Sequence, residues 1–218
     1  MKLTEDTLKV LKNFASINPS IIVKPGQTLY SITEEENVIG IANVEEQFDQ
    51  KFALFNLNEF LSVYGMFDKP ELKFNDGHVD IEDSDSRVRY MFSNPSVLKF
   101  NQREVKMPNA DLEVILSDEV IVQIRMASSV LGHAHMKVTG TAGDSSVKLS
   151  VFDIKDSESN VYTTKVDAVS VASDVDVTFL INNLKLIGGD YILKISNRGI
   201  THWTNKNGKI EYYVAIEK

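Results

Sequence analysis

The sequence predicts an α+β protein built from two similar domains, each rich in strands and each with two short helical segments. Two observations lead to this class. Most of the 218 residues fall in short runs rich in Val, Ile, Thr, Phe and Tyr, which Asn, Gly, Asp and Ser interrupt. The few helical segments occur twice, in the same order along the chain, which is the signature of an internal repeat.

The clearest helix begins after Thr4 and ends at Asn18 and Pro19. Thr4 is a suitable N-cap, and Glu5 and Asp6 place negative charge in the first turn, where the helix dipole favours it. With the α-helical period, the side chains of Val10, Leu11, Phe14, Ala15 and Ile17 share one face, and those of Lys9, Lys12, Asn13 and Ser16 share the other. We expect one buried face and one basic face.

A second helix is predicted from Ser117, with acidic residues in its first turn, to Gly132, which is a typical helix terminator. This helix and the first are related by a constant offset in residue number. The offset links three pairs of similar positions: Thr4 with Ser117, Lys12 with Arg125, and Ile17 with Val130. Such a constant offset indicates a duplicated domain.

Residues 55–61 and 179–185 form the second repeated pair. Each is predicted as a strand that runs into an Asn-capped helical turn. Their offset is slightly larger, as loop insertions between the copies would produce. The polar stretch 101–109, with its proline, reads as a connector, so the predicted domains are residues 1–108 and 109–218.

The composition restricts the function. The formal charge is −8, from 23 Lys and Arg against 31 Asp and Glu, and the acidic residues gather in patches at 34–49 and 80–85. A uniformly DNA-coated surface is therefore excluded, although basic groups can still dominate elsewhere. The sequence has no cysteine, no signal-peptide pattern and no apolar run of about 20 residues that could span a membrane. We expect a cytosolic protein without thiolate sites.

Catalytic and metal-binding motifs are not evident. His133 and His135 have a spacing that some metal sites use, but no third ligand lies nearby. Asp83 and Asp85 begin like a calcium loop, which Arg87 interrupts. No phosphate-binding loop, dinucleotide fingerprint or nucleophile elbow occurs, and Asn207-Gly208 reads as a hairpin turn. The sequence thus predicts neither an enzyme nor a bound cofactor or metal.

Several segments resemble the sliding clamps of T-even-type bacteriophages, the processivity factors of DNA polymerases. The similar residues are Met1-Lys2-Leu3, Asp6-Thr7, Leu11 to Ala15 and Ile17-Asn18 near the start, Asn56-Leu57-Asn58 and Phe60-Leu61 further on, and Tyr213 to Glu217 near the end. The resemblance implies the DNA-clamp fold, with antiparallel sheets and two short helices in each of two domains, as the subunit of a ring.

The resemblance also implies a function and partners. Three subunits would close head to tail into a homotrimer that encircles double-stranded DNA, without regard to base sequence, and tethers the replicative DNA polymerase. An ATP-driven clamp loader would open the ring. RNA polymerase-associated late transcription factors would be further partners, and the setting would be the cytoplasm of the infected bacterial host.

Two sets of residues carry the expected contacts. The family turns its helices toward the hole, so the DNA-facing candidates are Lys9, Lys12, Arg125 and Lys185. The family also has a hydrophobic pocket for partner peptides, whose matching positions here are Val105, Met107, Pro108, Tyr213, Val214 and Ile216. Ordinary solvation and packing are the competing explanations for both sets.

The sequence also fits an alternative function from another class of protein. A structural β-rich virion protein, or an oligomeric interaction protein with no role at DNA, would have a similar strand-heavy composition. Only a clamp has a reason to place basic groups at the matched repeat positions Lys12 and Arg125. The position of these side chains therefore separates the two readings.

Overall fold

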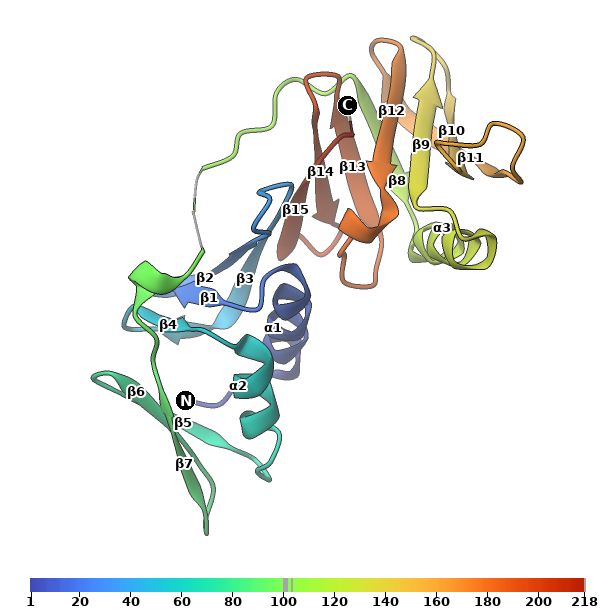
Figure 1. Ribbon diagram of the computed structural model, residues 1–218. Coiled ribbons are helices and arrows are strands. Elements are labelled where there is room, and N and C mark those ends of the chain that lie inside the picture. Colours follow the sequence, from blue (N-terminus) through green and yellow to red (C-terminus); the bar gives the residue numbers. More distant parts are fainter. Residues whose placement is uncertain (100–101, 103, 218) are drawn as a thin grey trace. The chain divides into compact units, whose positions relative to one another are not determined.

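The structure, a computed structural model, describes residues 1–99, 102 and 104–217. It divides into two compact units, Met1–Arg103 (unit 1) and Glu104–Lys218 (unit 2), shown in Figure 1. The division lies a few residues before the boundary predicted after residue 108. Residues 101 and 103 of the predicted connector lie outside the described residues. Each unit has its own buried apolar core.

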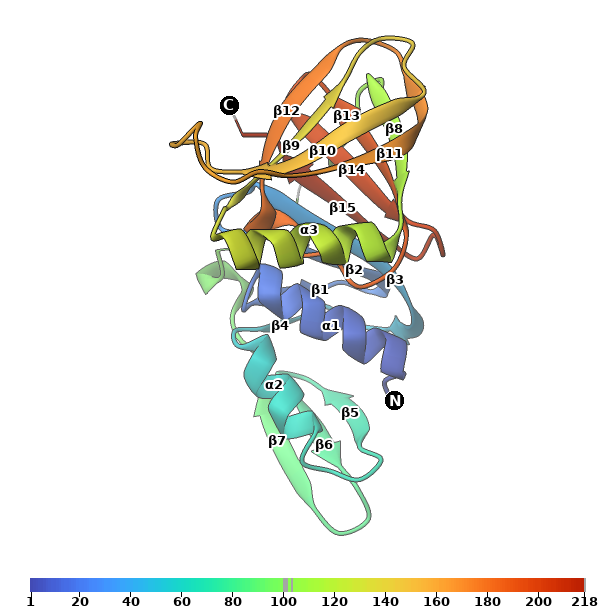
Figure 2. The same ribbon diagram turned by 90° about the vertical axis from the view of Figure 1, so that its right-hand side faces the viewer.

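Unit 1 combines helices with three small antiparallel strand arrangements. Its described helices are α1 (Glu5–Ile17), α2 (Leu57–Tyr64) and the 3₁₀ turn η1 (Pro95–Val97). Its strands pair as β1 (Ile21–Val23) with β4 (Phe52–Leu54), as β2 (Gly26–Ile32) with β3 (Val38–Phe48), and as a sheet of β5 (Glu71–Asn75), β6 (His78–Glu82) and β7 (Arg87–Met91). Figure 2 shows α1 and α2 side by side, with the β5–β7 sheet beyond α2.

Helix α1 has the predicted bounds. The Thr4 side chain accepts a hydrogen bond from the Thr7 backbone N–H at 3.2 Å, and the Asn18 N–H donates to the Phe14 carbonyl at 2.9 Å. The buried carboxylate of Glu46, on β3, accepts from the Thr4 N–H at 2.5 Å and from the Thr7 hydroxyl. A strand residue thus supports the helix start, which the sequence pattern did not indicate.

Close packing of α1 on β3 depends on a glycine. A Cβ atom at Gly40 would lie 2.7 Å from the Phe14 Cε1 atom and 3.0 Å from the Ile17 Cδ1 atom. Both side chains belong to the buried face of α1. The missing side chain of Gly40 therefore allows the helix to approach the strand.

Unit 2 is built on one antiparallel sheet, ordered β12-β9-β10-β11-β8-β13-β14-β15. Its helical elements are α3 (Asp118–Leu131) and the 3₁₀ turn η2 (Ile181–Asn183). The strands are β8 (Leu112–Leu116), β9 (His135–Gly140), β10 (Ser146–Phe152), β11 (Tyr162–Val171), β12 (Val175–Leu180), β13 (Tyr191–Ser196), β14 (Ile200–Asn205) and β15 (Ile210–Ala215).

The second long helix also begins and ends where the sequence predicted. Ser117 caps α3 by accepting from the Val120 N–H at 3.4 Å, and Gly132 terminates it in the left-handed conformation, with φ 69°. The fully buried Trp203 and Tyr191 are among the largest side chains of the unit 2 core, with ring centroids 6.5 Å apart. The predicted Asn207-Gly208 hairpin turn joins β14 to β15.

The second predicted helical turn of unit 2 is shorter than its counterpart in unit 1, and the prediction of an Asn cap there is wrong. Asn56 caps α2 through the Glu59 N–H at 3.1 Å, as predicted. The corresponding N-cap of η2 is Leu180, which has no side chain able to accept, and the turn lasts only three residues. Without that cap, the chain leaves the helical conformation early.

We expect Gly40→Ala to lower the free energy of unfolding by about 1–3 kcal/mol, because the added methyl group overpacks the α1–β3 contact. Urea unfolding followed by circular dichroism measures the change. Ser16→Ala, on the exposed face of α1, is the control and should stay within about 0.5 kcal/mol of the original chain. An unchanged Gly40→Ala midpoint would contradict this packing.

Candidate nucleic-acid interface

The outward face of α1 is basic, as predicted. Lys9 and Lys12 are both exposed, and the Lys9 side chain retains 64% of its accessible surface. The Lys9 Nζ atom lies 3.2 Å from the Asp6 carboxylate one turn earlier, so this cation is partly neutralised. Lys12 forms no hydrogen bond or ion pair with the described residues. Its charge is therefore available to an anion in solution.

Arg125, the repeat counterpart of Lys12, has a different environment. One terminal nitrogen of its guanidinium group donates to the Leu184 carbonyl at 2.7 Å and to the Leu186 carbonyl at 3.2 Å. The side chain is partly buried and is held against the segment that follows η2. Arg125 therefore differs from Lys12 in its surroundings, because backbone carbonyls of a neighbouring segment hold its guanidinium group.

The segment that Arg125 holds is fixed by several further hydrogen bonds. The Asp118 carboxylate accepts from the Gly189 N–H at 2.7 Å, and the Asp118 N–H donates to Asp190 at 3.0 Å. The Ile187 N–H donates to the Tyr212 hydroxyl at 3.2 Å. Irregular backbone here replaces the longer helix found in unit 1, and side chains satisfy its polar groups. Arg125 is one member of that network.

Lys185 lies in this segment, two residues beyond η2, and is half-buried. It is not part of a helix, and it has an interaction of its own within the chain. The outward face of α3 is mainly apolar: Val122, Met126 and Val130 are 44%, 60% and 77% exposed. The four predicted DNA-facing residues are thus not equivalent, since only Lys9 and Lys12 lie on an exposed helical face.

The six positions predicted for a partner-peptide pocket lie in unit 2 and differ in exposure. Val105, Met107 and Pro108 are half-buried, and so is Ile216. Tyr213 is 9% exposed and stacks on the His202 ring, with centroids 4.5 Å apart and planes within 8°. Val214 is a fully buried core residue of β15, so its side chain is not on a surface. Only the other five positions can contact a partner.

The environment of Tyr213 keeps its hydroxyl protonated. Burial raises the pKa of Tyr213, and the nearby Glu211 carboxylate raises it further. The same carboxylate contacts the His202 ring nitrogen at 2.6 Å. At neutral pH Tyr213 therefore presents a neutral hydroxyl that is able to donate a hydrogen bond.

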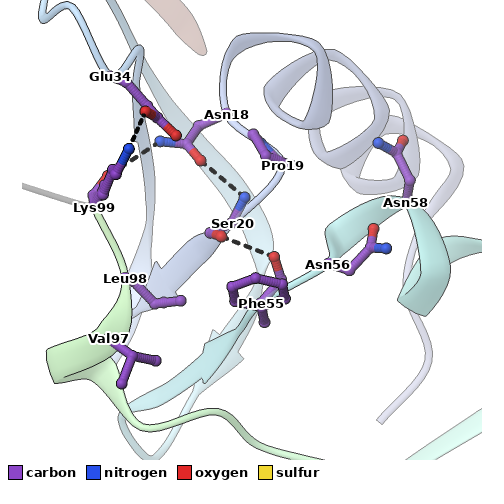
Figure 3. Close-up of a pocket in the computed structure, with 10 residues that line it drawn as sticks. All are labelled: Asn18, Pro19, Ser20, Glu34, Phe55, Asn56, Asn58, Val97, Leu98 and Lys99. Carbon is purple, nitrogen blue, oxygen red and sulfur yellow. Dashed lines mark hydrogen bonds and ion pairs between the residues drawn. The ribbon is translucent and has the colours of Figure 1, made fainter.

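Unit 1 has a surface cleft of about 550 Å³, shown in Figure 3, that the sequence patterns did not indicate. Phe55 and Val97 line its apolar side and are 64% and 62% exposed. The Lys99 Nζ atom and the Glu34 carboxylate form an ion pair of 2.8 Å at one end, and Asn56 and Asn58 line the other end. A cleft with exposed apolar walls can receive an apolar side chain of a partner.

A second groove runs along α3 in unit 2. It is lined by Gln123, Met126, Ala127, Val130, Leu131, Asn160, Val161 and Tyr162. The Tyr162 hydroxyl donates to the Gln123 side chain at 3.2 Å and joins β11 to the helix. Residues Tyr162 to Asp167 of β11 pair with β10, whereas pairing with β8 starts only at Ala168. Apolar side chains therefore lie beside a strand edge that is partly unpaired.

The residues considered for metal binding have ordinary structural partners. The His133 ring nitrogen lies 2.8 Å from the Asn160 carbonyl, and His135 packs near Phe152. The Asp83 side chain accepts from the Asp85 and Ser86 N–H groups in the β6–β7 hairpin turn. Within the described residues, no group of three or more His, Asp or Glu side chains could hold an ion, and no helix could span a membrane.

Three known proteins with similar sequences are of one kind. The sliding clamp of Vibrio phage KVP40 is 27% identical over 221 residues, which cover 100% of this chain and 99% of the relative. This chain resembles the phage sliding clamps along its whole length. The sliding clamps of Enterobacteria phage T4 and Escherichia phage RB69 are 27% and 25% identical, over 100% of this chain and 97% of each relative. The predicted resemblance to T-even-type phage clamps is confirmed. No family model matches the sequence.

Solved structures confirm the predicted DNA-clamp fold. Proliferating cellular nuclear antigen from Entamoeba histolytica has a TM-score of 0.70 at 13% identity, over 97% of this chain and 94% of that one. A. fulgidus PCNA bound to the C-terminal region of FEN-1 gives 0.75 at 9%, over 100% and 97%. The Helicobacter pylori beta clamp gives 0.73 at 10%, over 100% of this chain and 63% of that chain. The fold is therefore shared across sequences that have diverged far.

We expect Arg125→Met to lower the free energy of unfolding by about 1.5–3 kcal/mol, because two backbone carbonyls lose a charged donor. The matched variant Lys12→Met should change it by less than about 0.5 kcal/mol, since Lys12 is exposed. Urea denaturation of both variants measures the difference. Equal effects at the two positions would contradict the different environments described for them.

Proposed function

We propose that this protein is a DNA polymerase sliding clamp with no catalytic chemistry of its own. Three subunits close into a ring around duplex DNA, and the ring tethers the replicative polymerase for processive synthesis. The observation that carries this proposal is the similarity to phage sliding clamps over 100% of the chain. The clamp fold supports it independently.

Self-association is supported by exposed apolar surface on both units. Met126, Val130 and Val161 of the α3 groove are 60%, 77% and 54% exposed, and Met66 and Met91 of unit 1 are 73% and 63% exposed. Met91 lies on β7, at the edge of the β5–β7 sheet. Unpaired strand edges beside apolar side chains are typical of surfaces that a second chain covers. A head-to-tail contact uses two such surfaces, one from each unit.

The grip on DNA must be weak and independent of sequence, because a clamp that read base edges would stall at favourable sites. Lys9 and Lys12 on the outward face of α1 supply phosphate attraction of that kind. The formal charge of −8 opposes adhesion of DNA to the rest of the surface. The ring therefore holds DNA by topology more than by affinity.

Partner binding is the remaining part of the proposal. Val105, Met107 and Pro108, with Tyr213 and Ile216, offer an apolar surface for a short peptide of the polymerase. The similar A. fulgidus PCNA was solved with the C-terminal region of FEN-1, so a clamp of this fold accepts a terminal peptide. An ATP-driven loader and the late transcription factors of the virus would be further partners in the host cytoplasm.

The function is tested by topological retention, which needs no loader. Protein is allowed to thread onto a linear duplex with biotinylated ends, the ends are blocked with streptavidin, and unbound protein is washed away. A ring should stay on the blocked duplex at high salt and leave when a restriction enzyme cuts it. A protein that binds by charge alone would dissociate at high salt whether or not the ends are blocked, and that result would reject the clamp.

We expect Val130→Glu to shift the protein from a trimer toward a monomer, because a charge in the apolar groove opposes its burial at a subunit contact. Light scattering over a concentration series measures the molar mass relative to the 24.5 kDa chain. Val97→Glu, at a similarly exposed valine outside the groove, is the control. A trimer that persists in Val130→Glu would place the contact elsewhere.

A further inference from the structure

We propose that each subunit contacts DNA phosphate through only one of its two repeated helices: Lys12 of α1 is the principal contact, and α3 contributes none. This inference rests on the proposed clamp function and refines it. A ring of three subunits would then grip the duplex at three equivalent places, instead of six. The observations behind it come from the two helices and from the network around Arg125.

The first observation is the distribution of basic residues among the helices. Helix α1 contains Lys9 and Lys12, α2 contains no basic residue, and α3 contains Arg125 alone. Any phosphate contact made by a cationic side chain of a described α-helix must therefore come from one of these three residues. Lys9 is close to Asp6 at 3.2 Å, which weakens its attraction for a second anion.

The second observation is that the backbone of a neighbouring segment holds one guanidinium nitrogen of Arg125. This nitrogen donates to the carbonyls of Leu184 and Leu186, both of which are buried residues. Both hydrogen bonds and its partial burial hold the guanidinium group against the backbone, and turning it out into solvent would break both bonds and leave two carbonyls without that donor. Arg125 therefore acts as a structural brace, whereas the matched Lys12 keeps its charge in solvent.

The third observation is the chemistry of the outward face of α3. The residue of α3 matched to Lys9 by the repeat is Val122, which is 44% exposed, and the exposed neighbours are Met126 and Val130. Glu119 is exposed in the first turn of the same helix. An apolar face with a carboxylate gives phosphate no attraction. Helices α1 and α3 thus have similar lengths, but the outward face of α1 is basic and that of α3 is mainly apolar.

Salt dependence of DNA binding measures the number of phosphate contacts directly. The affinity of the trimer for a fluorescent linear duplex is determined by anisotropy between about 50 and 200 mM salt, and its logarithm is plotted against the logarithm of salt concentration. Each lost contact lowers the slope by about 0.9, so Lys12→Gln should lower it by roughly 2.7 in a trimer. Arg125→Gln and Lys185→Gln should leave the slope unchanged.

Two results would overturn the inference. One is a slope that Lys12→Gln does not change; the other is a slope that Arg125→Gln or Lys185→Gln lowers as much as Lys12→Gln does. Lys185→Gln serves as the second control, because Arg125→Gln can perturb the segment that it braces. Thermal unfolding of each variant identifies such a perturbation. Arg125→Lys keeps the positive charge on α3, so equal slopes for Arg125→Lys and Arg125→Gln support the inference, and a lower slope for Arg125→Gln alone overturns it.

Failure of the inference is separable from failure of the clamp function. The chain has no cysteine, so Ser16→Cys on α1 and Ser129→Cys on α3 each carry a single photo-crosslinker, at exposed positions matched by the repeat. Because the outward face of α3 is the proposed subunit contact, only Ser16→Cys on α1 is expected to crosslink DNA, whichever lysine supplies the attraction. The absence of crosslinks from both would reject the clamp itself. Crosslinks from Ser16→Cys, together with an unchanged Lys12→Gln slope, would reject only the inference.

Discussion

The packing of one long helix against strands in each unit is the constraint on which the rest of the structure depends. Burial of Phe14 and Ile17 beside Gly40 fixes α1, and burial of Ile121 and Ile124 fixes α3. Close packing allows few substitutions on these buried faces, because even one added or removed methyl group destabilises a core. The opposite faces are free of that constraint, so function can differ there.

That freedom explains how the outward faces of the two helices can differ in surface chemistry. The outward face of α1 carries cations, whereas that of α3 carries exposed apolar side chains beside a partly unpaired strand. In the proposed ring, one surface must tolerate a sliding polyanion and another must hold the neighbouring subunit. Cations in solvent serve the first need, and apolar burial serves the second. Unit 1 can therefore supply the attraction for DNA and unit 2 the subunit contact, whereas two identical units would each have to supply both.

Loss of the second helix in unit 2 has a structural consequence for that division. Where α2 has an Asn cap and eight residues, η2 has three residues and no side-chain cap. The backbone after η2 must then be satisfied by side chains, and Arg125, Asp118 and Tyr212 supply these hydrogen bonds. Because the helix is shortened, the Arg125 side chain is held against backbone carbonyls. The two repeated helices therefore differ in the cations that they expose.

The sequence by itself determined the strand-rich two-unit organisation, the bounds of α1 and α3, the hairpin turn at Asn207-Gly208 and the resemblance to phage clamps. These features rest on local signals, namely caps, turn residues and periodicity, which act over a few positions. Only the tertiary structure decided that Arg125 is bound to distant carbonyls, that Val214 is buried and that Phe55 lines a cleft. These properties depend on contacts between segments far apart in the chain, which neither the type of a residue nor its repeat position specifies.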